Sequence, residues 1–237
     1  LKVHSSTILH QSLRTLALLH RSDTPFLDEP NLALVITLLS SSLFMDTPKA
    51  QAYLMVTINN ECAAHPKVSP LIVAKLSERG QQQALLRFFD CCIKTVQDDE
   101  ASPAGIGLLD LFTHVFLKEA SFADTYRRVI GALATSPSAL SKLVSSINNI
   151  TTKAVDMSAA LRMIQRVAQY FPSKVVLGGA VLPLLRICSA KITDATLPIA
   201  AAAYGAFSDL LKFANAPLQN LLWKVMSHAM FLQVGLT

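Results

Sequence analysis

The chain has 237 residues, of which 51% are hydrophobic and 16% are charged, and its formal net charge is +5. This composition excludes intrinsic disorder for most of the chain, and the length suffices for one or two folded domains. The longest stretches without an ionised side chain, residues 30–45 and 195–208, are shorter than the roughly 18–20 apolar residues that a membrane span needs. We therefore predict no membrane span. Because residue 1 is Leu, we expect the native N-terminus to be missing.

Helical periodicity extends along almost the whole chain, and no convincing pair of strands is present. After Met157, for example, Leu161, Ile164 and Ala168 continue a stripe with the three-to-four spacing of an amphipathic helix. One expected helix contains Pro183, where we predict either a kink or a later helix start. The pattern predicts an all-α fold with helices at 5–21, 31–45, 48–64, 69–79, 81–97, 104–118, 122–134, 138–148, 152–171, 174–188, 196–214 and 216–233.

A hydroxyl residue followed by proline recurs at the expected helix starts, and Asn215-Ala216-Pro217 is a looser version. The hydroxyl oxygen accepts a bond from a free backbone N–H of the first turn, and proline fits the first helical position because it has no N–H group. The four pairs are Thr47-Pro48, Ser69-Pro70, Ser102-Pro103 and Ser136-Pro137. They indicate many short helices rather than a few long ones.

The C-terminal third contains two similar segments, one beginning at Asp156 and the other at Asp194. Each continues into a helix with a Leu-Leu pair, Leu184-Leu185 or Leu221-Leu222. Two-helix repeats of roughly 34–47 residues are the signature of α-solenoids. We therefore predict a single solenoid fragment of about six helix pairs over residues 1–237, with a possible break at 97–103 and the most regular repeats at 124–233. A compact irregular helical domain is the alternative.

The last of these segments ends in Asn220-Leu-Leu-Trp223, after an Ala-rich helix headed by Asp194. Over residues 156–233 this pattern resembles the organellar octotricopeptide and heptatricopeptide repeat proteins, which often carry an Asn-Leu-Leu-Trp-like second helix. The resemblance implies RNA binding or RNA–protein assembly in mitochondria or chloroplasts. The earlier repeats differ in length and lack the Trp, so generic HEAT- or armadillo-like stacking is the alternative. We expect Trp223 itself to lie in the core at a repeat junction.

Positive charge is concentrated in residues 125–193, where nine Lys and Arg accompany a single acid, Asp156. Residues 98–124, in contrast, hold one Lys and six Asp or Glu. A solenoid face lined with cations attracts phosphate backbones and releases counterions on binding. The competing interpretation is a solvated or intersubunit face, which meets an acidic partner or the chain's own residues 98–124. The candidate RNA-binding residues are Arg127, Arg128, Lys142, Lys153, Arg162, Arg166, Lys174, Arg186 and Lys191. We expect the four arginines Arg127, Arg128, Arg162 and Arg166 to make the main phosphate contacts.

Two of these arginines, Arg162 and Arg166, fall with Ser158 and Gln169 on one side of a predicted helix, opposite its apolar stripe. A guanidinium group can form two bonds to one phosphate. We therefore expect this polar stripe to run along a groove and to meet phosphates and base edges. Aromatic side chains are sparse nearby, and we expect Tyr170 to be half-buried rather than to stack on a base.

Motifs for catalysis are missing from the sequence. GxSxG, GxxxxGK[ST], HExxH and CxxC do not occur, and Gly105-x-Gly107 lacks the third glycine of a dinucleotide-binding loop. We predict no enzymatic activity, no metal site and no cofactor. The acidic run Asp98-Asp99-Glu100 is expected to form a solvated turn. The cysteines, Cys62, Cys91, Cys92 and Cys188, are expected to be reduced thiols packed like small apolar residues, which favours a reducing compartment.

These observations favour a non-catalytic helical-repeat protein that binds RNA through a basic face within an RNA–protein assembly. The family resemblance gives organellar RNA processing, editing or the ribosome as the context. It favours the mitochondrial matrix as the location, with the cytosol and the nucleus as alternatives. The alternative is a HEAT- or armadillo-like scaffold subunit of a large complex that binds only proteins, which the high apolar content favours. Other protein subunits are expected partners in both cases.

Overall fold

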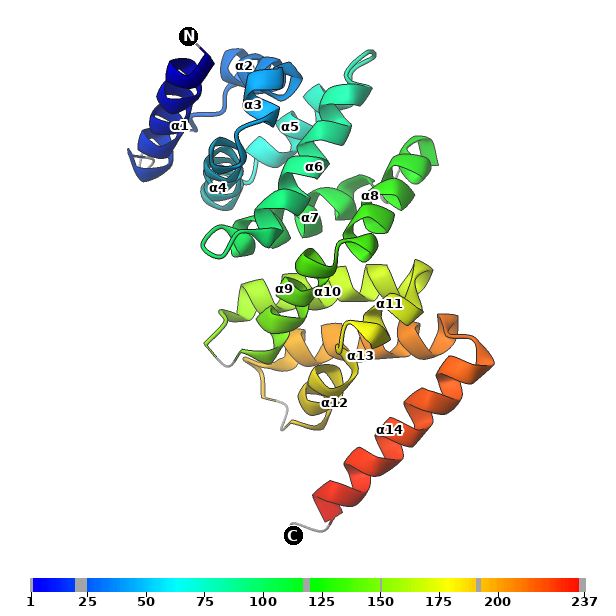
Figure 1. Ribbon diagram of the computed structural model, residues 1–237. Helices are drawn as coiled ribbons and strands as arrows, with labels where there is room; N and C mark the ends of the chain where they lie inside the picture. Colours follow the sequence, from blue (N-terminus) through cyan, green and yellow to red (C-terminus); the bar gives the residue numbers. More distant parts are fainter. Residues whose placement is uncertain (1, 20–24, 117–119, 150, 191–192, 235–237) are drawn as a thin grey trace. The chain divides into compact units, whose positions relative to one another are not determined.

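The computed structural model describes residues 2–19, 25–116, 120–149, 151–190 and 193–234. These residues form fourteen α-helices and one short 3-10 helix, and none of them lies in a strand. The predicted all-α fold is therefore confirmed. The chain divides into two compact units, unit 1 (Leu1–Val129) and unit 2 (Ile130–Thr237), and the division falls within helix α8 (Ala123–Thr135) (Figure 1).

Unit 1 is built around α6 and α7, whose aromatic side chains interlock. Phe88 and Phe112 meet edge to face with ring centroids 5.0 Å apart, and Phe89 and Phe116 meet in the same way at 5.6 Å. All four rings are buried, so they form the centre of the core. In chain order the unit contains α1 (Lys2–Leu19), α2 (Glu29–Ser40), α3 (Ser42–Met45), α4 (Pro48–Ala64), α5 (Val68–Leu76), α6 (Gln82–Gln97), α7 (Ser102–Phe116), η1 (Ala120–Phe122) and the first half of α8.

Gly105 lets α7 approach α6 closely. A Cβ atom on Gly105 would lie 2.6 Å from the backbone N of Val96 and 2.9 Å from the carbonyl oxygen of Cys92. Both atoms belong to the backbone of α6, which has no freedom to move aside. Gly105 of the Gly105-x-Gly107 pair thus serves helix packing, and the 97–103 connector is the turn that joins the two packed helices.

Two of the cysteines lie in this core. Cys91 and Cys92 are buried in α6, with their Sγ atoms 3.9 Å from Sδ of Met45 and 3.6 Å from Sδ of Met55. Burial raises the pKa of Cys91 to about 12 and raises that of Cys92 as well, so both thiols stay protonated at neutral pH. Their packing as small apolar residues on a helix is as predicted.

A buried carboxylate fastens the segment before α2 to α4. Glu61 is fully buried, and its two carboxylate oxygens accept the backbone N–H groups of Phe26 and Leu27 at 3.1–3.2 Å. Another long-range contact closes the end of α2, where Nη1 of Arg87 on α6 donates to the carbonyl oxygen of Leu39 at 3.0 Å. A cation at the C-terminus of a helix also interacts favourably with the helix dipole.

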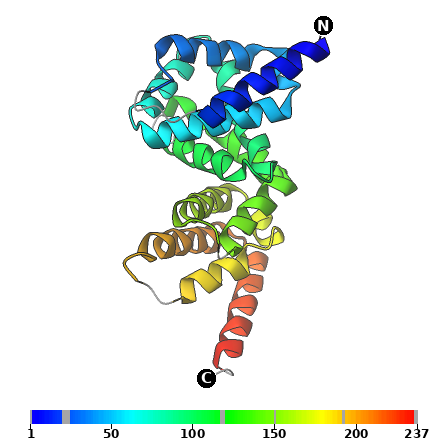
Figure 2. The same ribbon diagram turned by 90° about the vertical axis from the view of Figure 1, so that its left-hand side faces the viewer.

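Unit 2 is centred on α10 and α13, which lie side by side (Figures 1 and 2). Both helices carry fully buried small side chains, among them Ala160 and Ala168 of α10 and Ala203 and Ala206 of α13. On one side of this pair, α9 packs against α12. After the second half of α8 the unit contains α9 (Pro137–Asn148), α10 (Ala154–Tyr170), α11 (Pro172–Leu177), α12 (Val181–Ser189), α13 (Leu197–Phe213) and α14 (Ala216–Val234).

An arginine also closes a helix end in unit 2. Nη2 of Arg186 on α12 donates to the carbonyl oxygens of Ile147 and Asn148, at 3.3 and 3.1 Å, in the last turn of α9. A tyrosine does the same for α12. The hydroxyl of Tyr204 on α13 donates to the carbonyl oxygen of Cys188 at 2.7 Å, near the end of α12. These bonds satisfy carbonyl groups that the helices themselves leave without partners.

Two predicted helices are each divided in the structure. The expected helix 31–45 is interrupted at Ser41 to give α2 and α3, and the expected helix 174–188 is interrupted after Leu177 to give α11 and α12. At the second break Gly179 has a φ of 79°, a conformation that favours glycine. Helix α12 therefore starts at Val181, with Pro183 in its first turn, which is the later start that the sequence allowed.

The proline of each hydroxyl–proline pair lies in the first turn of a helix, but the hydroxyl groups differ in role. Ser136 caps α9 with its side chain, as predicted. Thr47 and Ser69 instead donate to backbone carbonyl oxygens of the preceding residues, and Ser102 is itself the first residue of α7. Asn215 accepts a backbone N–H at the start of α14, so the looser version of the signal also caps a helix.

Candidate functional site

The candidate RNA-binding cations occupy different environments and both units. Arg127 and Arg128 are exposed on α8 within unit 1. Lys191 lies outside the described residues. In unit 2, the exposed candidates are Lys153, Lys174 and Arg186, and the half-buried ones are Lys142 and Arg162. Of the exposed residues, Arg186 already binds the end of α9.

Arg166 does not lie on an exposed stripe, contrary to the prediction. Only 7% of its surface is exposed, and its Nη1 donates to Sδ of Met163 at 3.1 Å. Ser158 is also buried, and Gln169 is directed toward α13. The predicted polar stripe therefore lies largely inside the protein, because α13 covers α10 on a second side.

Two glutamines of α10, Gln169 of this stripe and its neighbour Gln165, hold an acid of α13. Nε2 of Gln165 and Nε2 of Gln169 each lie 2.8 Å from Oδ2 of Asp209. Bonds from a neutral donor to an ionised acceptor are stronger than bonds between neutral groups. The polar side chains of α10 thus serve the contact between α10 and α13.

The net positive charge of the chain belongs to unit 2. Residues 130–237 contain nine Lys and Arg and three Asp, whereas residues 1–129 contain twelve Lys and Arg and thirteen Asp and Glu. One of the three acids, Asp209, is engaged by the two glutamines. The net charge of unit 2 is therefore positive, whereas that of unit 1 is close to zero.

Exposed apolar side chains gather in the same unit. Among the described residues, twelve large apolar side chains are exposed, and nine of them belong to unit 2. The largest exposed fraction, 82%, is that of Leu177 at the end of α11. The nine residues are Val155, Tyr170, Leu177, Leu182, Leu197, Tyr204, Phe213, Leu221 and Trp223. Periodicity alone did not identify this concentration, because these positions follow the same helical spacing as core positions.

Trp223 is 56% exposed, so the expectation that it lies in the core at a repeat junction is wrong. Its neighbour Leu222 is fully buried instead. Consecutive residues of a helix point about 100° apart. The Asn220-Leu-Leu-Trp223 pattern therefore does not show by itself which of its residues faces the core.

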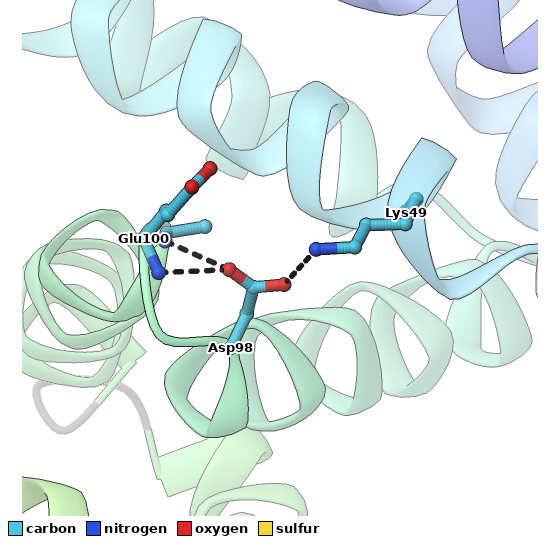
Figure 3. Close-up of polar contacts among 4 residues, drawn as sticks. Lys49, Asp98 and Glu100 are labelled. Atoms are coloured by element: carbon cyan, nitrogen blue, oxygen red, sulfur yellow. Dashed lines mark hydrogen bonds and ion pairs between the residues drawn. The ribbon is translucent and has the colours of Figure 1, made fainter.

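Unit 1 contains a hollow, lined by both apolar and charged residues, that sequence analysis did not indicate. It has a volume of about 210 Å³ and lies between α4 and the turn that joins α6 to α7. Nζ of Lys49 lies 3.0 Å from Oδ2 of Asp98, and Oδ1 of Asp98 accepts the backbone N–H groups of Glu100 and Ala101 (Figure 3). Its lining residues are Lys49, Ala52, Tyr53, Val56, Asp98, Glu100 and Ala101.

The contacts of Asp98 set its charge state. Burial raises its pKa, but the N–H of Ala101, the Lys49 ammonium group and the N–H of Glu100 together outweigh burial, so the pKa lies below the ordinary value of 3.8. The same bond to Asp98 raises the pKa of Lys49. Asp98 is thus the fixed cap of this turn rather than the solvated carboxylate that we expected. Both of its oxygens are engaged, which gives it a structural role.

Comparison with known proteins returns no relative: no protein family, curated protein or solved structure matches the chain. Among the described residues, no three or more His, Cys, Asp or Glu side chains are grouped so that they could hold a metal ion. Within the same residues, no helix combines the length and apolar character needed to cross a membrane. The exposed apolar side chains and the net positive charge make the surface of unit 2 the best candidate for a functional site.

Proposed function

We propose that the chain is a non-catalytic helical-repeat scaffold whose unit 2 binds an acidic protein partner within a larger assembly. The observation that carries this proposal is the presence, in one unit, of nine exposed large apolar side chains and of the net positive charge of the chain. Covering apolar surface lowers the free energy by roughly 25 cal/mol for each Å². A phosphate backbone offers no apolar surface to Val155, Leu177 or Leu182, whereas a protein partner covers them and pairs its acids with the cations.

The helix contacts of unit 2 support a repeat architecture of the HEAT or armadillo kind. If α8, α10 and α13 are the first helices of successive pairs, then α9, α12 and α14 are the second helices. The contact of α10 with α13 joins two first helices, and the contact of α9 with α12 joins two second helices. Stacking of this kind covers apolar faces that a single pair leaves open. Such repeats present extended surfaces to protein partners.

Zero-length crosslinking of native complexes tests the proposed function. A carbodiimide joins a lysine amine directly to a carboxylate, so it records contacts between cations of unit 2 and acids of a partner. We expect crosslinks from the exposed Lys153 and Lys174 to Asp or Glu of another chain, identified by mass spectrometry. Crosslinks to other chains that arise only from unit 1 would contradict the proposal.

A matched pair of leucines provides the second arm of this experiment. Leu182 in unit 2 and Leu34 in unit 1 are each 62% exposed. We expect Leu182→Glu to reduce the yield of the Lys153 and Lys174 crosslinks severalfold and Leu34→Glu to leave it unchanged. Circular dichroism checks that both variants keep the wild-type helix content. Equal yields from both variants would show that apolar contact in unit 2 does not contribute.

RNA binding is the second candidate function, and the exposed cations favour it. Residues 125–193 contain one acid, and Lys153 and Lys174 of this segment are exposed in unit 2. In a filter-binding titration with single-stranded RNA, affinity should fall steeply with salt, with a log–log slope of about −0.7 for each phosphate contact. Lys153→Glu with Lys174→Glu should weaken binding severalfold, whereas Lys67→Glu with Arg79→Glu, two exposed cations of unit 1, should not. Organellar RNA processing and a mitochondrial location stay predictions that follow from the family resemblance.

A further inference from the structure

Helix α14 is attached to unit 2 at its beginning and leaves it afterwards. Oδ1 of Asn215 accepts the N–H of Leu218, and Nε2 of Gln219 donates to the carbonyl oxygen of Leu211 at the end of α13. Leu222 is the last fully buried residue of the helix among those with described side chains. Figures 1 and 2 both show the second half of α14 with no described helix of unit 2 beside it.

Helix α14 has a wider apolar face than the structure buries. At 100° per residue, the apolar residues from Leu221 through Val225, Leu222 and Met226 to Trp223 span an arc of about 200°. A helix that packs on one neighbour needs an apolar stripe of only about 100°. In the structure the two edges of the arc, Leu221 and Trp223, are exposed, and Val225 and Met226 are only half-buried.

In the proposed repeat pairing, α14 lacks a contact with the second helix before it. Two second helices, α9 and α12, pack against each other, but α14 makes no comparable contact with α12 among the described residues. The wide apolar arc of α14 is therefore left without the neighbour that the preceding second helices have. A helix from another molecule fits this position, because a helical face covers a helical face.

The charges around the arc define the chemistry of that helix. Lys224 is exposed on α14, and Lys212 is exposed at the end of α13, with its Nζ 5.1 Å from the ring centroid of Phe213. Asp209 is held by glutamines of α10, and Asp194 lies before the other end of α13, a helix of 17 residues that is about 25 Å long. Lys212 and Lys224 are thus the only Lys, Arg, Asp or Glu residues between Leu210, in the last turn of α13, and the end of α14.

We propose that the apolar arc of α14, flanked by Lys212 and Lys224, docks an amphipathic helix of a protein partner that carries Asp or Glu beside its own apolar stripe. This inference rests on the proposed function and names the surface and the partner chemistry. Trp223 lies at the edge of the docked helix and loses contact with water when the helix binds. Large aromatic side chains of this kind often dominate the binding energy of an interface.

Trp223 is the only tryptophan of the chain, so its fluorescence reports on this surface alone. The probe is a designed helical peptide with Leu at positions i, i+3, i+4 and i+7 and Glu on both flanks, titrated into the full chain. We expect a saturable blue shift of Trp223 emission. A peptide with the same Leu stripe and Lys flanks should bind about tenfold more weakly. Equal binding of the two peptides, or no shift with the Glu peptide, overturns the proposal.

Two sets of variants locate the contact. Lys212→Glu with Lys224→Glu should reverse the preference between the two peptides, and a preference that stays unchanged overturns the charge argument. Leu221→Ser should weaken binding of the Glu peptide about fivefold, whereas Leu34→Ser in unit 1 should not. Circular dichroism again controls for the fold. If both leucine variants bind like the wild type, the arc is not the docking surface.

The remaining outcomes separate this inference from the proposed function. A blue shift that grows with protein concentration alone, together with dimers in sedimentation, assigns the arc to a second copy of the chain and overturns the proposal. A shift produced by single-stranded RNA that competes with the peptide also overturns it. Crosslinks from Lys153 and Lys174 without any peptide effect at Trp223 overturn only the α14 surface and leave the proposed function in place.

Discussion

Single polar residues fix backbone segments that are far apart in the sequence. Glu61 binds two N–H groups that lie 34 and 35 residues earlier, and nothing near Glu61 in the sequence distinguishes it from a solvated helix residue. The same limit applies to Arg162 and Arg166, which look alike in the sequence although one is half-buried and the other buried. Sequence analysis thus identifies the candidate residues of unit 2, but their burial depends on which helix packs against them.

Removing the Glu61 carboxylate should destabilise unit 1. In Glu61→Ala the N–H groups of Phe26 and Leu27 lose their acceptor, and we expect the free energy of unfolding to fall by about 1–3 kcal/mol. Chemical denaturation followed by circular dichroism measures this change. The control is Glu78→Ala, which removes a half-exposed carboxylate paired with Lys75 and should leave the free energy of unfolding nearly unchanged. Equal effects of the two variants would show that the buried bonds contribute nothing.

Asp98 should make the stability of unit 1 sensitive to acid. Because its pKa in the folded protein is lower than the ordinary 3.8, its contribution is present above pH 3.8 and is lost as the pH falls through the folded value. Asp98→Asn keeps an oxygen for the two backbone N–H groups but removes the charge that faces Lys49. We expect the variant to be less stable than the wild type at pH 7 and the difference to shrink below pH 4. Denaturation at a series of pH values measures it, and a difference independent of pH would exclude this role.

The positions of the helices follow from apolar periodicity, whereas their breaks and outer faces do not. Residues 157–171 show the predicted stripe, with Leu161, Ile164 and Ala168 fully buried. The opposite stripe was predicted to run along a groove and to meet RNA. It instead lies largely inside the protein, because α13 also packs against α10. The break before α12 depends on a left-handed Gly179, which the sequence does not distinguish from any other glycine.

Helix α7 should tolerate a methyl group at Gly107, which faces α4, but not at Gly105, which faces α6. A Cβ on Gly105 meets the backbone of α6, whereas a Cβ on Gly107 meets only Oδ1 of Asn59, the end of a side chain that can rotate. We expect Gly105→Ala to lower the free energy of unfolding by about 1–3 kcal/mol. Gly107→Ala should leave it unchanged or raise it by up to about 1 kcal/mol, because alanine favours a helix. Thermal or chemical denaturation distinguishes the two, and equal destabilisation would contradict the packing argument.

At the scale of the molecule, charge and exposed apolar surface are both unevenly divided between the two units. The excess of Lys and Arg over residues 125–193 is visible in the sequence, but the exposure of nine large apolar side chains in unit 2 is not. That exposure bears on the choice between RNA binding and binding of a protein partner. Cations alone favour RNA, while cations beside exposed Leu, Val and Trp favour an acidic protein partner.

The positive charge of unit 2 should be measurable at Trp223. Anions accumulate near a positively charged surface and cations are repelled, so iodide should quench Trp223 fluorescence more strongly than caesium. The difference should shrink as an inert salt is added, because the screening length falls to about 10 Å at 0.1 M. Stern–Volmer titrations measure both slopes. Equal slopes at low salt would show that the charge of unit 2 does not extend to this side chain.

The backbone carbonyl groups at the ends of α2 and α9 depend on arginines that come much later in the chain. Arg186 reaches back 39 residues to Ile147, and Arg87 reaches back 48 residues to Leu39. During synthesis on the ribosome, the final turns of α9 and α2 therefore keep water as their partner until α12 and α6 have emerged. Each of these two helix ends is thus completed only after a helix from later in the chain has been synthesised.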